Sequence, residues 1–285
     1  MDATRFTLLP PLDLRDRFPG LRAELTALLR GLSPEEWNRE TVCPGWSVQD
    51  IAAHLLADDL GRLSWGRDRF VSPTFAAGLD IDTLPGFIQA IDRQNGVWVA
   101  AARRFSPALL LDLLTVSGEW TEAYFASLDL NAIGMPVDWA GPDPAPVWLD
   151  VAREYTERWV HQQQIRDAVG QPGLKERQWL HPVLATFVRA LPLALTPVNA
   201  PDGTAVRLTI TGDAGGAWVA RRDVGKWLLG AAPDLAVDAT VTLDQETAWR
   251  LFTKGIAKNE ARQRATIAGD RALAEHILST VSILA

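Results

Sequence analysis

The spacing of apolar residues changes once along this chain, near residue 173, and this change most constrains the fold. Before it, long segments carry apolar residues at helical spacing, as in 16–31, where leucines recur every three or four residues. After it, short segments alternate apolar and polar residues, as in 206–212, which is typical of a half-buried strand. The sequence therefore predicts a helical part followed by a part that contains strands.

The helical part is divided by capping and turn signals. Segment 131–146 holds four prolines and two glycines and is predicted to be a long surface connection. Ser47 is placed to cap the helix that follows it. Long helices are predicted over 16–31, from Ser47 onward, and over 83–105, 107–129 and 147–169. Such elements predict a bundle of long antiparallel helices over residues 1–173.

The second part, residues 174–285, mixes strands and helices. Strands are predicted at 206–212, 216–223, 225–232, 239–244 and 264–269. Helices are predicted over 174–195, over 245–255 and from Asp270 to Ala285. Strands with interspersed helices predict an α+β domain. The expected fold class is thus α plus α+β, with a helical domain 1–173 and a smaller domain 174–285.

Composition and charge limit the classes of function. The net charge of −7 and the lack of a basic stripe argue against a nucleic-acid partner. The single cysteine, Cys43, excludes an internal disulfide and a cysteine-based zinc site, and it fits a reducing compartment. No apolar run approaches the roughly 20 residues that span a bilayer, and prolines and charges interrupt the N-terminal segment. We therefore expect a cytoplasmic protein without a membrane partner, either a monomer or a homodimer.

Three residues are candidates for a metal site. Glu157 and His161 stand four apart and so share one helical face, and His54 lies on the helix that follows Ser47. Two imidazoles and a carboxylate can hold a divalent ion and leave a coordination position open, as catalytic metal sites do. The residues alone leave alternatives: a Glu and a His at this spacing are commonly a solvated pair, and His54 is also compatible with a hydrogen-bonded core histidine.

Two motifs accompany these residues. One runs from Trp37 through Cys43-Pro44-Gly45-Trp46-Ser47-Val48 to His54-Leu55-Leu56, and the other is the Glu-x-x-x-His pattern from Glu157 to His161. Together they resemble the DinB-like mycothiol-dependent maleylpyruvate isomerase family. Residues 174–285 are similar to that family's sterol-carrier-like C-terminal domain, mainly through 239–255 and 264–270.

The resemblance implies a DinB-like four-helix bundle that binds a divalent metal through His54, Glu157 and His161. Zinc is the expected ion, and nickel and iron also suit these ligands. A low-molecular-weight thiol such as mycothiol is implied as cofactor, with a small electrophile as substrate. At residues 252–258, however, the chain lacks the arginine-bearing GRGDG-like segment of the isomerase, and this departure argues against maleylpyruvate isomerisation itself.

The expected function is therefore a metal-dependent enzyme, a thiol transferase or a maleylpyruvate isomerase-like protein. It would transfer the sulfur of the thiol to the small electrophile, or isomerise that substrate. The alternative is a non-catalytic protein that binds a metal or an apolar ligand.

Further residues near the three metal candidates are candidates for supporting roles. Arg166, Gln162 and Trp46 are the catalytic candidates: Arg166 to meet an anionic substrate, Gln162 or a neighbouring glutamine to face the cavity, and Trp46 to wall it. Glu154 and Asp58 are candidates to orient a ligand imidazole. Cys43 precedes a Pro-Gly turn and is expected to pack as a small hydrophobe rather than to act as a nucleophile. For each of these residues a purely structural role is the alternative.

Overall fold

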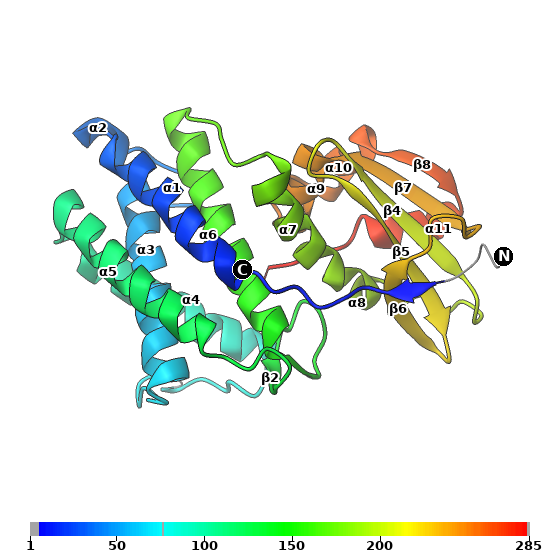
Figure 1. Cartoon of the computed structure of the whole chain (residues 1–285), viewed down its shortest axis with the longest axis horizontal. Helices are drawn as coiled ribbons and strands as arrows, with labels where there is room; N and C mark the ends of the chain where they lie inside the picture. Colours follow the sequence, from blue (N-terminus) through cyan, green and yellow to red (C-terminus); the bar gives the residue numbers. More distant parts are fainter. Residues whose placement is uncertain (1–5, 76, 284–285) are drawn as a thin grey trace. The chain divides into compact units, whose positions relative to one another are not determined.

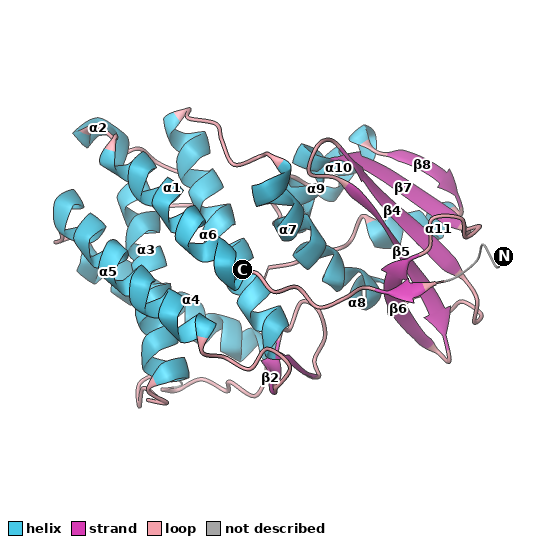
Figure 2. Ribbon diagram, in the orientation of Figure 1, coloured by secondary structure: helices cyan, strands magenta, loops and turns pink. Residues whose placement is uncertain are grey.

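The computed structural model describes residues 6–75 and 77–283. Its contacts group into two units, each with its own architecture. The helical unit consists of residues 14–129 and 154–173, and the sheet unit consists of residues 6–13, 130–153 and 174–283 of the described chain. The named strands of the described chain all lie in the sheet unit, and helices occur in both units (Figure 2). The predicted fold class, a helical bundle followed by an α+β part, is confirmed.

The helical unit is built around a core shared by its long helices (Figure 1). Leu29, Ile51, Leu110 and Ile165 come from four different helices and are fully buried. Burial of such side chains is the main favourable contribution to the stability of a bundle. The helices are α1 (Phe18–Arg30), α2 (Pro34–Trp37), α3 (Val48–Gly61), α4 (Leu84–Ala102), α5 (Pro107–Ala126) and α6 (Val147–Val169), with the short η1 (Arg15–Arg17) and the π-helical η2 (Arg62–Arg67).

The sheet unit contains a six-stranded sheet in the order β1-β6-β5-β4-β7-β8 among the described residues. Strands β4 and β7 are parallel and all other neighbours are antiparallel. The strands are β1 (Thr7–Leu8), β4 (Ala205–Thr211), β5 (Gly216–Asp223), β6 (Lys226–Ala231), β7 (Ala239–Asp244) and β8 (Thr266–Gly269). Leu208 pairs with Val241 and Ile210 with Leu243, and all four side chains are buried.

Helices cover this sheet and complete its core. Three of them, α8, α9 and α11, pack on the strands, and α7 packs on α9. The helices are α7 (Arg177–Phe187), η3 (Val188–Ala190), α8 (Leu191–Leu195), α9 (Gln245–Phe252), α10 (Lys258–Arg264) and α11 (Arg271–Ile277). The predicted helix 174–195 is thus divided by a 3-10 turn. The last predicted helix ends at Ile277 rather than Ala285, and residues 284–285 lie outside the described part.

Segment 131–146 is mostly exposed or half-buried, as its prolines and glycines predict, but it is not irregular throughout. It forms a small hairpin of β2 (Ile133–Pro136) and β3 (Pro144–Pro146), and Val137 and Trp139 between the strands are buried. Both strands are short and proline-containing, so they lack the alternation that marks a strand in a sequence.

The predicted domains 1–173 and 174–285 stay a prediction. The contacts group residues 130–153 with the sheet unit as well as the residues after Gly173. Within the described residues, none of the helices is both long and apolar enough to cross a membrane.

Candidate metal site

The start of α3 determines where His54 lies. Ser47 caps the helix: its hydroxyl accepts the Asp50 N–H at 3.3 Å, and the Asp50 carboxylate accepts the Ser47 N–H at 2.9 Å. This reciprocal capping box fixes the first turn of the helix. His54 follows one turn after Asp50 on a buried part of α3, with 5% of its surface exposed. The indole of Trp46, at the helix start, lies 5.2 Å from the imidazole between ring centroids.

Helix α6 contributes Glu157 and His161, which are adjacent on one face because they are four residues apart. His161 Nε2 lies 3.0 Å from Glu157 Oε1, and His54 Nε2 lies 3.7 Å from the same oxygen. The two imidazoles meet nearly edge to face, with centroids 4.6 Å apart. One nitrogen from each histidine and one carboxylate oxygen lie within 4.8 Å of one another. The structure therefore brings together the three residues that the sequence singles out.

These separations suit a first-row metal. Zinc bonds of about 2.1 Å in a tetrahedral site place neighbouring ligand atoms about 3.4 Å apart. The two Nε2–Oε1 separations, 3.0 and 3.7 Å, fall on either side of that value. Nitrogen and carboxylate ligands in this number leave at least one coordination position free of protein. The group could thus hold a metal with small side-chain adjustments.

The charges around the group favour a cation. Burial lowers the pKa of His54, but Asp58 and Glu157 oppose it and raise the pKa to about 9. Burial raises the pKa of Glu157, but hydrogen bonds from His161 and His54 prevail and hold the pKa well below its ordinary value. The carboxylate is therefore ionised, and the His54 imidazole lies where positive charge is stabilised.

Asp58 adds a second carboxylate beside the group. Its Oδ2 lies 3.6 Å from His54 Nε2 and is buried without a hydrogen-bond partner. Burial raises the pKa of Asp58 to about 6, although His54 opposes the shift. Asp58 approaches Nε2 of His54, the nitrogen that also faces Glu157. It therefore makes no hydrogen bond to Nδ1, on the opposite side of the ring. Two carboxylates beside two neutral imidazoles would balance the charge of a divalent cation.

Two arginines neutralise the neighbouring carboxylates. Arg158 donates to Glu154 Oε2 and to Asp59 Oδ1, both at 2.7 Å, and Arg62 donates to the other oxygen of Glu154. Ser117 donates to Asp59 Oδ2 at 2.9 Å. Glu154, which the sequence suggests as an acceptor for a ligand imidazole, instead holds these two guanidinium groups. The negative charge that is left over therefore belongs to Asp58 and Glu157.

The three glutamines after His161 point to different partners. Gln164 Oε1 lies 2.7 Å from His161 Nδ1 and 3.3 Å from Cys43 Sγ. Gln163 is buried and donates to the Gly173 carbonyl. Gln162 is buried too, and neither of its amide atoms has a hydrogen-bond partner in the described structure. The sequence did not single out Gln164, although its i, i+3 spacing from His161 is a signal for such a contact.

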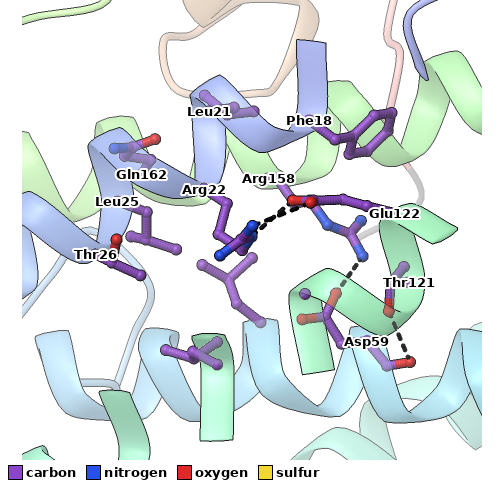
Figure 3. A pocket seen from close by; sticks show the side chains of 13 residues that line it. Phe18, Leu21, Arg22, Leu25, Thr26, Asp59, Thr121, Glu122, Arg158 and Gln162 are labelled. Atoms are coloured by element: carbon purple, nitrogen blue, oxygen red, sulfur yellow. Dashed lines mark hydrogen bonds and ion pairs between the residues drawn. The ribbon is translucent and has the colours of Figure 1, made fainter. Parts of the chain in front are cut away.

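Gln162 faces a cavity on another side of α6 (Figure 3). The cavity has a volume of about 30 Å³, and none of the three metal-ligand candidates lines it. The ion pair of Arg22 with Glu122 lies beside it. A volume of this size holds about one or two water molecules. Gln162 thus does not face the metal-ligand group, and the cavity is too small for a substrate.

The remaining catalytic candidates differ in their placement. Trp46 lies against His54, as expected of a wall of the site. Arg166 forms an ion pair with Glu24 at 3.4 Å. Cys43 is half-buried, and burial raises the pKa of its thiol, which fits a packed thiol rather than a nucleophile. Whether Arg166, Gln162 or Trp46 acts in catalysis stays a prediction.

A family described as the mycothiol maleylpyruvate isomerase N-terminal domain matches residues 18–166, more than half of the chain. All three metal-ligand candidates lie within the matched residues. No curated protein matches the chain in sequence.

Solved structures resemble the chain at low sequence identity. A crystal structure of a mutant of the mycothiol-dependent maleylpyruvate isomerase has a TM-score of 0.52 and 12% identity, over 90% of this chain and 93% of that one. A second structure of the same isomerase has a TM-score of 0.49 and 13% identity, over 84% and 88%. Sterol Carrier Protein 2 Like 2 from Aedes aegypti covers 34% of this chain and 95% of its own, with 19% identity and a TM-score of 0.26. At these identities the first match shows a shared fold.

Proposed function

The chain belongs to the mycothiol maleylpyruvate isomerase N-terminal domain family, and from this we propose that it is a metal-dependent enzyme that uses a low-molecular-weight thiol. The thiol, mycothiol or a similar molecule, adds to a small electrophile and either stays on it or leaves again after isomerisation. The observation that carries this proposal is the convergence of His54, Glu157 and His161 within 4.8 Å.

The residues of the site have different proposed roles, which follow from their charge and position. His54 and His161 would hold the metal through Nε2 and Glu157 through its carboxylate, with zinc as the expected ion and nickel or iron also suited. When bound, such an ion supplies a lowered pKa for a bound thiol and polarisation of a carbonyl. Asp58 Oδ2 is free to accept a hydrogen bond from a molecule in the site. The Trp46 ring and the burial of His54 limit access of water.

Thiol transfer is retained beside isomerisation because of residues 252–258. The resemblance places an arginine-bearing segment of the isomerase there, and this chain has Lys254-Gly255 instead. Lys254 adopts a left-handed backbone conformation, with φ of 58°, at the turn after α9. Transfer of a thiol to a small electrophile, with the adduct as product, requires no such segment. We therefore propose a class of enzymes that includes thiol transferases as well as isomerases.

Metal content tests the proposal first. We expect purified protein to contain close to one equivalent of zinc, nickel or iron by elemental mass spectrometry, and the His54→Ala/His161→Ala variant to contain little. His276→Ala is the matched control, because His276 lies on α11 in the sheet unit. Equal and low metal content in wild type and double variant would refute the metal site.

Turnover tests the second part. Monochlorobimane is an electrophile whose thiol adduct is fluorescent. We expect the metal-loaded protein to accelerate its reaction with mycothiol, and the double variant to give only the uncatalysed rate. A loaded protein that shows no thiol-dependent consumption of this or other small electrophiles would instead be a non-catalytic metal-binding protein.

A further inference from the structure

The two histidines of the candidate metal site, His54 and His161, differ in the hydrogen bonding of Nδ1. His161 Nδ1 lies 2.7 Å from Gln164 Oε1. His54 Nδ1 is buried and has no hydrogen-bond partner in the described structure. A histidine that binds a metal through Nε2 must carry its proton on Nδ1, and an acceptor at Nδ1 stabilises this tautomer. Only His161 has a protein acceptor placed for that purpose.

Cys43 lies against the same amide oxygen of Gln164 that faces the His161 ring. Its Sγ lies 3.3 Å from the same Oε1, so two donors converge on one amide oxygen. The loop that carries Cys43 is itself held: Thr41 Oγ1 accepts the Cys43 N–H at 3.2 Å and donates to the Trp46 carbonyl at 2.8 Å. The oxygen of Gln164, rather than its NH2 group, is thus presented to His161.

We propose that Gln164, held by Cys43, is a positioning residue that keeps the His161 ring in the Nδ1–H tautomer, with the Nε2 lone pair directed at the metal position. This inference rests on the proposed metal-dependent function and extends it to a residue outside the metal-ligand set. Gln164 is neutral, so it orients the ligand without adding to the negative charge of Asp58 and Glu157. Residues in such positions commonly change metal affinity about 10- to 100-fold when they are replaced.

The test compares zinc affinity among variants by competition with a chromophoric chelator. Gln164→Leu removes the acceptor and is expected to weaken zinc binding about 10- to 100-fold. Gln164→Glu keeps an acceptor at the same atom and is expected to bind zinc at least as tightly as wild type. Gln163→Leu is the matched control, because it removes the bond to Gly173 from the same helix without touching His161. We expect its zinc affinity to be unchanged.

A spectroscopic measurement separates orientation from general loss of structure. In zinc-loaded wild type, long-range proton–nitrogen NMR should show His161 protonated at Nδ1 and bare at Nε2. In Gln164→Leu this signature should broaden or shift, while that of His54 stays. Cys43→Ser keeps a donor to Oε1 and should leave the zinc affinity unchanged, whereas Cys43→Ala should weaken it by a smaller factor than Gln164→Leu.

The outcomes distinguish this inference from the proposed function. Wild-type affinity in Gln164→Leu, or an equal loss in Gln163→Leu, overturns the role of Gln164 and leaves the metal site intact. Failure of the wild type itself to bind zinc, nickel or iron overturns the proposed function, and the role of Gln164 falls with it.

Discussion

At the scale of single residues, Asp50 makes stability depend on pH. Its carboxylate accepts the Ser47 N–H and two hydrogen bonds from Arg103, at 2.9 and 3.0 Å. Burial raises the pKa of Asp50, but the Arg103 guanidinium and Ser47 prevail and hold the pKa below its ordinary value. Because the pKa is lower in the folded than in the unfolded state, ionised Asp50 stabilises the fold above about pH 4, and this contribution is lost as the pH falls through the folded pKa.

We therefore predict that Asp50→Asn lowers the free energy of unfolding by about 1–2 kcal/mol near neutral pH. The difference from wild type should shrink as the pH falls below about 4. Urea denaturation at a series of pH values measures it. Asp68→Asn, which affects an exposed pair with Arg67, should change little at any pH. A difference for Asp50→Asn that is the same at all pH values contradicts the role of its charge.

Residue spacing predicted that Glu157 and His161 are neighbours, but it could not predict that His54 lies beside them. Glu157 and His161 are neighbours because any helix places residues i and i+4 together. His54 is far away in sequence, and only the packing of α3 in the bundle core brings it to them. Family resemblance supplied that long-range contact. Of the contacts around Glu154, the one with Arg158 follows from i, i+4 spacing on α6, whereas Arg62 and Asp59 lie on other elements and had no signal in the sequence.

At the scale of elements, Arg158 joins its own helix, α6, to three other helices of the bundle. It reaches Asp59 on α3, and its guanidinium lies over the rings of Phe18 on α1 and Phe125 on α5, 5.6 and 5.8 Å from their centroids. Its partners Asp59 and Glu154 are buried, and the Arg158 side chain itself is only 14% exposed. Removing one partner from such a network leaves the others as uncompensated buried charges.

We predict that Arg158→Met lowers the free energy of unfolding by about 3–5 kcal/mol, because Asp59 and Glu154 lose a shared donor. Arg67→Met, which breaks an exposed pair with Asp68, should change the free energy of unfolding far less. Chemical denaturation of both variants gives the comparison. Equal effects of the two substitutions contradict the stabilising role of the buried network.

The β5–β6 hairpin carries a local conflict between sequence and conformation. Val224 and Gly225 form its turn, with φ of 47° and 75°. Positive φ at both positions favours a type I′ turn, for which Asn-Gly is the preferred pair. A β-branched residue is strained in this conformation. The side chain of Val224 is 84% exposed, so packing provides no compensation.

Val224→Asn should therefore raise the free energy of unfolding by roughly 0.5–1 kcal/mol, since asparagine tolerates a positive φ. Val224→Thr is the control: it is polar but β-branched, and it should give no gain. The two variants are compared by thermal and urea unfolding. A gain in Val224→Thr as large as in Val224→Asn would mean that polarity, rather than backbone conformation, is responsible.

Elements with a strong local signal were predicted well, and those defined by distant partners were not. Helix α3 starts at its predicted cap and β7 matches the predicted strand residue for residue. The strand β1 has only two residues and exists because β6 offers it an edge to pair with. No short window of sequence contains both β1 and β6. Strands β2 and β3 are close in sequence, but their prolines disguise a hairpin.

At the scale of the whole molecule, the chain is divided between two units and α6 belongs to both. Its first residues group with the sheet unit, and Glu154 to Val169 group with the helical unit. The change of periodicity near residue 173 gave no sign that residues 130–153 group with the sheet. That grouping depends on burial of Trp139 and Trp148 in a cluster with Ala190, which is distant in sequence. Periodicity reports local structure and carries no information about such contacts.

All three metal-ligand candidates lie in the helical unit, on α3 and on the second part of α6. A ligand that binds only the folded state stabilises what it binds, by about 2.7 kcal/mol at a concentration one hundred times its Kd. We therefore predict that zinc slows amide hydrogen exchange in α3 and in residues 154–169. Strands β4, β5 and β7 provide none of these ligands, and their exchange should be unchanged.

Hydrogen exchange with mass spectrometry, with zinc or with a chelator, measures this directly. The His54→Ala/His161→Ala variant should show no response to zinc in any segment, which separates site binding from loose association with surface carboxylates. Slower exchange in the strands alone would place the metal elsewhere. A response confined to α3 and α6 would show that the ion joins two helices that are far apart in the sequence. Metal binding and the stability of the bundle would then be coupled.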